Sequence, residues 1–185
     1  MSLVSSMLRG ALGFAVVGVA SFAVWAYGGK VFAPLGGEKA MYAGCALVFL
    51  LLSGALLHPL VAGPGSYGRF NKVFFPAFFL YALVWSVLWF VMGFGLGEWL
   101  ASALGSVAFV FVCACRLGGW KAVAAASFVL FLTHSAGYFL GGEVYYPSSR
   151  GVMMKMVWGL IYGIGFGAGV GYVFWALQRA ALRKV

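Results

Sequence analysis

The 185-residue sequence has few charged side chains, no aspartate and only three acidic residues. Charged residues make up 8% of the chain, whereas an ordinary globular domain carries about 25%. So few charges cannot cover a water-facing surface. The composition therefore excludes a secreted domain, a soluble enzyme and a disordered regulator.

Several functional signatures are also missing. The sequence has no Walker A motif, so the chain cannot power transport by hydrolysing ATP itself. It has no GxSxG or H-E-x-x-H element, and three glutamates make paired-carboxylate catalysis a poor fit. The cysteines, at positions 45, 113 and 115, have no metal-ligand spacing. We expect no catalytic residue, metal site or cofactor, and an enzyme is the less favoured interpretation.

Apolar residues are abundant, at 64% of the chain with a mean hydropathy of +1.04. A membrane-spanning helix needs roughly 20 such residues, so six would use about 120. Because backbone polar groups in lipid must be satisfied internally, each span should be helical. We predict an all-α integral membrane protein, a compact bundle of six transmembrane helices in one domain, 1–185. The expected spans are 10–27, 41–60, 72–94, 98–115, 120–141 and 153–177.

The net charge of +9 comes from twelve Lys and Arg residues. In a membrane protein this excess indicates the positive-inside bias and contact with anionic headgroups, so the expected partner is the lipid bilayer and not nucleic acid. With a cytoplasmic N-terminus, the inner set is Arg9, Arg69, Lys72, Arg116, Lys121, Arg179, Arg183 and Lys184, and the outer set is Lys30, Lys39, Arg150 and Lys155. We therefore predict that both termini are cytoplasmic, in a bacterial inner (plasma) membrane.

Small residues recur on the last span and on the first. Gly159, Gly163, Gly167 and Gly171 repeat every four residues, which puts them on one helix face. A weaker face contains Ala11 and Ala15. Small residues let two membrane helices approach closely. These faces predict packing within the bundle or, alternatively, docking of a membrane partner subunit through span one or span six.

The third span carries an aromatic stripe that ends in Trp85 and Trp89, and Trp99 follows near the start of the fourth. Such a stripe at helical spacing is typical of packing or lipid contact. Membrane aromatics normally gather at the two interfaces, however, and Trp85 lies deeper than that. The alternative is an outward-facing pocket that binds a flat or cationic solute by stacking or cation–π contact.

His134 is the most informative polar residue within the spans. An ionisable residue inside a membrane is a functional candidate, because burying it is costly unless it is paired. Tyr138 lies one helical turn later, and Glu98 and Glu143 are the nearest expected carboxylates. This set would suit substrate binding or proton relay. A neutral histidine bonded to a helix carbonyl or threonine is the plainer interpretation.

Two stretches resemble the substrate-binding S-components of energy-coupling-factor vitamin transporters. Ala11-x-x-x-Ala15 is similar to the pattern with which their first helix docks a partner subunit. The stretch 131–146, with His134, Gly137 and an aromatic loop after the helix, resembles the fifth span of thiamine-type members. The resemblance implies six spans, cytoplasmic termini, an outward vitamin pocket and partner subunits.

Three functions therefore remain open. The first is binding or transport of a small solute in an outer aromatic pocket formed by His134, Tyr138, Glu98, Trp99, Trp85, Trp89 and Glu143. The second is a non-catalytic accessory or assembly subunit of a larger membrane complex, docked through the glycine face. The third is a small lipid-modifying enzyme. The first requires a cavity, the second an outward glycine face, and the third access from lipid to His134.

Overall fold

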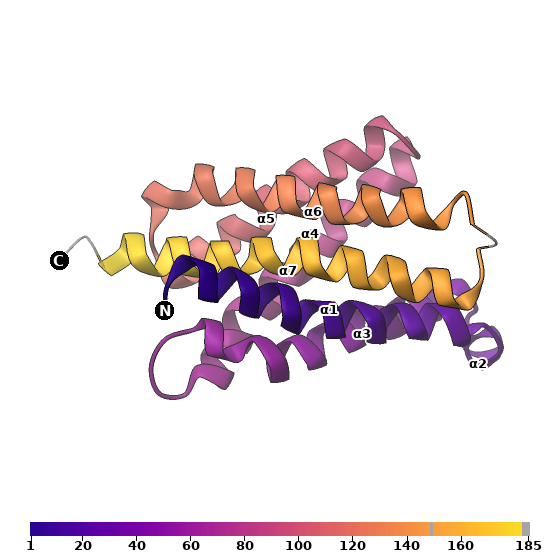
Figure 1. Cartoon of the computed structure of the whole chain (residues 1–185), viewed down its shortest axis with the longest axis horizontal. Helices are drawn as coiled ribbons and strands as arrows, with labels where there is room; N and C mark the ends of the chain where they lie inside the picture. Colours follow the sequence, from indigo (N-terminus) through magenta and orange to yellow (C-terminus); the bar gives the residue numbers. More distant parts are fainter. Residues whose placement is uncertain (149, 183–185) are drawn as a thin grey trace.

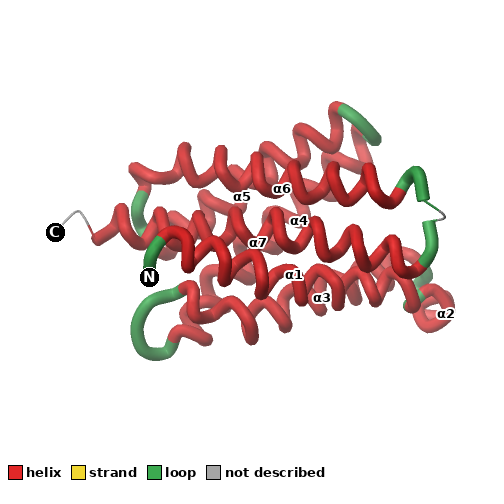
Figure 2. The backbone as a smooth tube through the Cα atoms, in the orientation of Figure 1, coloured by secondary structure: helices red, strands yellow, loops and turns green. Residues whose placement is uncertain are grey.

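The computed structural model describes residues 1–148 and 150–182, and within them every regular element is a helix (Figures 1 and 2). The six long helices are α1 (Leu3–Tyr27), α3 (Glu38–Leu57), α4 (Ser66–Met92), α5 (Leu96–Leu117), α6 (Val123–Tyr145) and α7 (Val152–Leu182). The short elements are α2 (Gly29–Phe32) and the 3-10 turns η1 (Ala33–Leu35), η2 (His58–Leu60) and η3 (Trp120–Ala122). All six long helices are apolar and long enough to cross a bilayer. The chain is a polytopic integral membrane protein.

The helices are mostly longer than the spans expected from hydropathy. The fourth expected span, 98–115, is the shortest and the one most open to a re-entrant interpretation, yet α5 has 22 residues and is about 33 Å long. The third expected span runs to residue 94, but α4 ends at Met92. Gly93 and Gly95 there have φ angles of 71° and 79°, a region that glycine enters without steric cost.

The long helix α7 occupies the middle of the bundle. It packs most extensively against α1 on one side and α6 on the other, while α3 lies beside α1 and α4 pairs with α5 (Figure 1). The first and last helices are therefore neighbours although they are farthest apart in the sequence. This position explains why α7 is the most buried of the six spans.

The glycines of α7 that repeat every four residues lie directly on α1. A Cβ added at Gly163 would be 2.8 Å from the Cα of Ala15, and one at Gly159 would be 2.7 Å from the carbonyl oxygen of Gly18. The hydroxyl of Ser6 donates a hydrogen bond to the carbonyl of Gly171 at 2.8 Å. The two helices thus meet backbone to backbone, as small residues permit.

A second set of glycines joins α7 to α6. A Cβ at Gly165 would be 2.8 Å from the Cα of Gly137, and one at Gly137 would be 2.9 Å from the carbonyl oxygen of Ile161. Thr133 of α6 lies against Gly169. Glycine on two faces of one helix therefore lets α7 contact two neighbours at close range.

This packing changes the interpretation of the small-residue faces as partner-docking surfaces. The face with Gly163 is covered by α1 and does not point away from the bundle. On α1, Gly10 and Ala15 are buried, whereas Ala11 is only half-buried. Gly10, Ala15 and Gly18 therefore form the close contact, and Ala11 is peripheral to it because it lies one position around the helix. Docking through Ala11-x-x-x-Ala15 would require α1 and α7 to separate.

The interior is built largely from aromatic rings. The stripe along α4 faces inward, with Phe70, Phe74 and Phe78 stacked at centroid distances of 5.0 and 5.5 Å. Phe14 of α1 and Phe166 of α7 pack against it with centroid distances of 6.5 and 6.2 Å to Phe78. These side chains are buried, so this part of the stripe forms the core instead of contacting lipid.

The two ends of the bundle differ in the charged side chains that they carry. The start of α1 and the end of α7 lie at the same end (Figure 1), which we call the basic end. Its described charges are Arg9, Arg69, Lys72, Arg116, Lys121 and Arg179, with no acidic side chain among the residues that the structure covers. Arg183 and Lys184 lie outside the described residues. The opposite, mixed-charge end carries Lys30, Lys39, Arg150 and Lys155 together with Glu38, Glu98 and Glu143.

Candidate functional site

Glu98 is a carboxylate that the fold holds at the mixed-charge end with little exposure. The α4–α5 turn passes through Gly95, and Glu98 is the third residue of α5. Its Oε2 accepts a hydrogen bond from the backbone N–H of Gly95 at 3.0 Å, so it caps its own helix. Only 9% of the residue is exposed. The position of this carboxylate therefore follows from a hydrogen bond within its own helix start and does not depend on another helix.

The second oxygen of Glu98 binds a different helix. The hydroxyl of Tyr138, on α6, donates to Oε1 at 2.8 Å. Tyr138 is itself fixed, because its carbonyl oxygen accepts a hydrogen bond from Nε1 of Trp158 on α7 at 3.1 Å. Both protein donors to the carboxylate are neutral. Glu98 thus joins α5 to α6 while its negative charge has no basic side chain hydrogen-bonded to it among the described residues.

Two tryptophans of α4 lie beside the hydrogen-bonded pair of Glu98 and Tyr138. The Trp85 ring lies 5.5 Å from the ring of Tyr138, edge to face, and stacks on Trp89 at 6.2 Å. Both indole N–H groups are buried and lack a hydrogen-bond partner within residues 1–148 and 150–182. Such groups are uncommon, since buried polar atoms are normally hydrogen-bonded. Glu98, Tyr138, Trp85 and Trp89 form what we call the Glu98 site.

His134 lies one helical turn below Tyr138 and is completely buried. Its Nε2 is 2.6 Å from the hydroxyl of Tyr81 on α4, and that hydroxyl is 3.3 Å from the hydroxyl of Tyr162 on α7. The imidazole packs parallel to the Tyr138 ring at 6.0 Å. The partner of His134 is therefore a tyrosine and neither a carboxylate nor a threonine or helix carbonyl, because the stripe on α4 brings Tyr81 to the same depth.

The remaining proposed pocket residues lie elsewhere. Trp99 is half-exposed and stacks on Phe139 at 4.3 Å, and Glu143 is exposed. Neither has a hydrogen bond or ring contact to Glu98 or Tyr138 among the described residues. Trp99 follows Glu98 directly, and consecutive residues of a helix point in different directions.

The sequence places Trp158 among the aromatic residues of this half of the bundle, but sequence reasoning missed Tyr162. Trp158 and Tyr162 lie on α7, next to Gly159 and Gly163, and both are buried. Their spacing of four residues was the available signal, since it puts the two rings on one face. Trp158 contacts Tyr138, Tyr145 and Trp25 at centroid distances of 5.7, 5.3 and 6.0 Å.

Basic side chains contact the aromatic rings at this end. The Lys155 ammonium lies 4.2 Å from the ring centroid of Trp25, and the Arg150 guanidinium lies 5.6 Å from that of Tyr146. Burial raises the pKa of the Tyr146 phenol, and the negative charge of Glu98 adds to this increase. Aromatic faces here already hold cations, a contact that the ring quadrupole favours.

The chemistry of the site follows from these groups. It offers a negative charge, three aromatic rings and two N–H donors, all at the mixed-charge end. Among the described residues, no group of three or more His, Cys, Asp or Glu side chains is arranged to hold a metal ion. His134 is enclosed by Tyr81, Tyr138 and other rings, so lipid has no access to it.

Comparison with protein families, with curated proteins and with solved structures finds no match to this chain.

Proposed function

We propose that the protein binds a small, amine-bearing solute at the Glu98 site. The observation that carries this proposal is the environment of the Glu98 carboxylate, which is 9% exposed and hydrogen-bonded by two neutral donors. Burying a charge without a compensating charge is unfavourable. A cationic nitrogen would complete the electrostatic balance of this carboxylate. A protonated amine is thus the ligand that the site favours.

The aromatic residues support the same ligand class. Tyr138 contacts the carboxylate and Trp85 packs against the ring of Tyr138, and tryptophan and tyrosine faces attract ammonium groups. The two indole N–H groups, which lack partners among the described residues, would donate to an acceptor on the same solute. We infer a solute that combines an amine with a hydrogen-bond acceptor, such as an amino-substituted heterocycle.

We assign the Glu98 site to the outer side of the membrane, with both termini cytoplasmic, in a bacterial plasma membrane. The uneven distribution of Lys and Arg supports this orientation by the positive-inside rule. Transport in the manner of an S-component would then require a partner subunit, which docks on a surface other than the covered face of α1.

Binding to the purified, full-length protein tests the proposal. A panel of small amines is measured against wild type and Glu98→Gln, which removes the charge but keeps the shape. Because hydrogen bonds to a charged group contribute about 1.5–3 kcal/mol, we expect Glu98→Gln to weaken binding roughly tenfold or more. Glu143→Gln is the matched control, since it removes an exposed carboxylate at the same end.

Tyr138→Phe tests whether a loss of amine binding comes from the missing charge of Glu98 or from a disturbed contact between α5 and α6. It removes the donor to Oε1 and leaves the carboxylate in place, so amine binding should persist or strengthen. Equal binding by wild type and Glu98→Gln, or equal loss in Glu98→Gln and Glu143→Gln, would contradict the proposal.

A further inference from the structure

A pocket of about 580 Å³ lies at the basic end, between η3 and the C-terminal part of α7. Lys121 of η3 and Arg179 of α7 both line it and are both exposed. Tyr172 and Trp175 line it as half-buried rings. Two cations from separate elements thus border one hollow together with two aromatic residues that carry hydrogen-bond donors.

The position of Lys121 depends on a pair of glycines. Gly118 and Gly119 both have a φ of 77°, which an L-residue with a side chain rarely adopts. A Cβ at Gly119 would lie 2.8 Å from the Cα of Leu177, so the chain lies directly on the backbone of α7. This close approach holds Lys121 next to the last turns of α7.

The charges around the pocket favour an anion. No acidic side chain lies at the basic end among the described residues, so neither cation is neutralised by one. The Arg179 guanidinium carbon lies 5.3 Å from the ring centroid of Trp175. Stacking on a ring restrains the guanidinium and leaves its N–H donors for a phosphate group, which arginine binds in a bidentate manner.

The rest of the pocket favours a lipid over a free ion. Ala176 and Ala180 line it as small apolar residues, which leave room beside the Tyr172 and Trp175 rings. Tyrosine and tryptophan are typical of the membrane–water interface, where lipid headgroups lie. Basic pockets between membrane helices on the cytoplasmic side are known to hold acidic headgroups. We propose that this pocket binds the phosphate of an anionic phospholipid, with Lys121 and Arg179 as its ligands.

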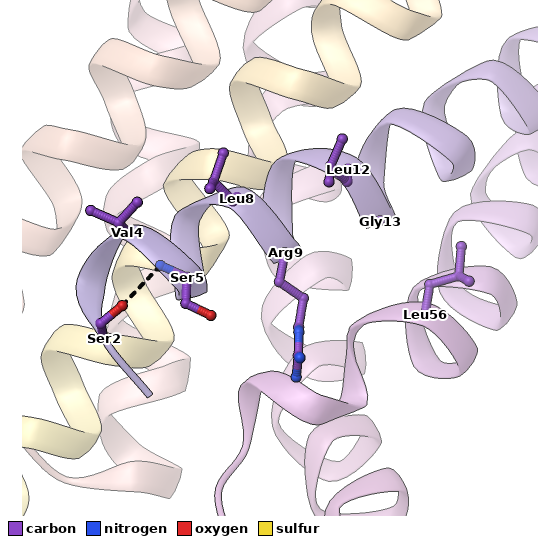
Figure 3. A pocket seen from close by; sticks show the side chains of 8 residues that line it. All are labelled: Ser2, Val4, Ser5, Leu8, Arg9, Leu12, Gly13 and Leu56. Atoms are coloured by element: carbon purple, nitrogen blue, oxygen red, sulfur yellow. Dashed lines mark hydrogen bonds between the residues drawn. The ribbon is translucent and has the colours of Figure 1, made fainter.

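A second hollow at the basic end provides a comparison. It measures about 570 Å³ and lies between the start of α1 and Leu56 of α3 (Figure 3). Arg9 is the one basic side chain among its eight lining residues, and Figure 3 shows it extending away from Leu8 and Leu12. It lacks both the second cation and the aromatic pair. We therefore expect weaker headgroup binding there.

Native mass spectrometry of the purified, full-length protein tests this site. Dioleoyl phosphatidylglycerol is titrated into wild type and into the double variant Lys121→Gln/Arg179→Gln. Interfacial basic residues contribute about fivefold each to binding of anionic lipid, so we expect roughly 25-fold weaker binding. The control is Lys30→Gln/Lys39→Gln, which removes two exposed charges at the other end and should change binding by less than about twofold.

Two further arms make the outcome specific. Ala180→Phe fills the pocket without changing charge and should also weaken phosphatidylglycerol binding. Inorganic phosphate is titrated alone and as a competitor. Equal losses in both double variants, or no loss in the pocket variant, would overturn the proposal. Phosphate that binds as tightly as the lipid would assign the site to the free ion and overturn its assignment to a phospholipid.

Discussion

Replacing Gly163 by alanine tests whether α1 and α7 meet backbone to backbone. The new Cβ would lie 2.8 Å from the Cα of Ala15 and 2.9 Å from the carbonyl carbon of Phe14. Carbon atoms pack best at about 3.5–4.0 Å, so the helices must separate by about 1 Å. Because both contacts are main-chain atoms, no rotamer change can relieve them.

The magnitude follows from two opposing effects. Overpacking of this kind costs about 1–3 kcal/mol, while alanine gains up to about 1 kcal/mol over glycine in a helix. We expect Gly163→Ala to lower the free energy of unfolding by about 1–2 kcal/mol. The assay is unfolding by sodium dodecyl sulfate in mixed micelles, followed by circular dichroism at the helix band.

Gly68→Ala is the matched control. Gly68 lies in the first turns of α4, is exposed, and has no atom near an added Cβ. The same substitution there should leave stability unchanged or raise it by up to about 1 kcal/mol. If Gly163→Ala is as stable as Gly68→Ala, the close contact between α1 and α7 does not exist.

Three further predictions concern the interior, the site boundary and the topology. Tyr81→Phe should destabilise the fold by about 1–3 kcal/mol, because it leaves Nε2 of the buried His134 without its partner. In the same unfolding assay Tyr162→Phe should cost less, because the Tyr162 hydroxyl lies 3.3 Å from that of Tyr81, a longer contact. Trp99→Leu should leave amine affinity unchanged, since Trp99 stacks on Phe139 outside the Glu98 site. A loss of amine affinity comparable with that of Glu98→Gln would show that Trp99 belongs to the site. In a bacterial host, a C-terminal green fluorescent protein should fluoresce and a C-terminal alkaline phosphatase should be inactive, and the reverse pattern would invert the topology.

Hydropathy alone predicted most of the fold. Six long apolar segments specify six helices, because lipid leaves the backbone no other way to satisfy its hydrogen bonds. The boundaries were less accurate, as α4 begins at Ser66 and α7 continues to Leu182. Amphipathic helix ends at the interface contain polar residues, such as Asn71 and Gln178, that a hydropathy window treats as loop.

Contacts between helices were harder to predict. The repeat that includes Gly163 indicated close packing but did not identify α1 as the partner, since one sequence does not say which helices are neighbours. For the same reason the sequence offered a carboxylate, a helix carbonyl or a threonine as the partner of His134, whereas the hydrogen-bond partner is Tyr81 of α4. Glu98 is different, because its position at the start of α5 follows from a local capping pattern.

The Glu98 site is tested most directly by a structure of the full-length protein bound to the amine with the highest affinity in the panel. We predict that the protonated nitrogen lies about 3 Å from a carboxylate oxygen of Glu98, with the solute against the rings of Trp85 and Tyr138. A bound solute whose nitrogen contacts neither Glu98 nor these rings would contradict the proposed function.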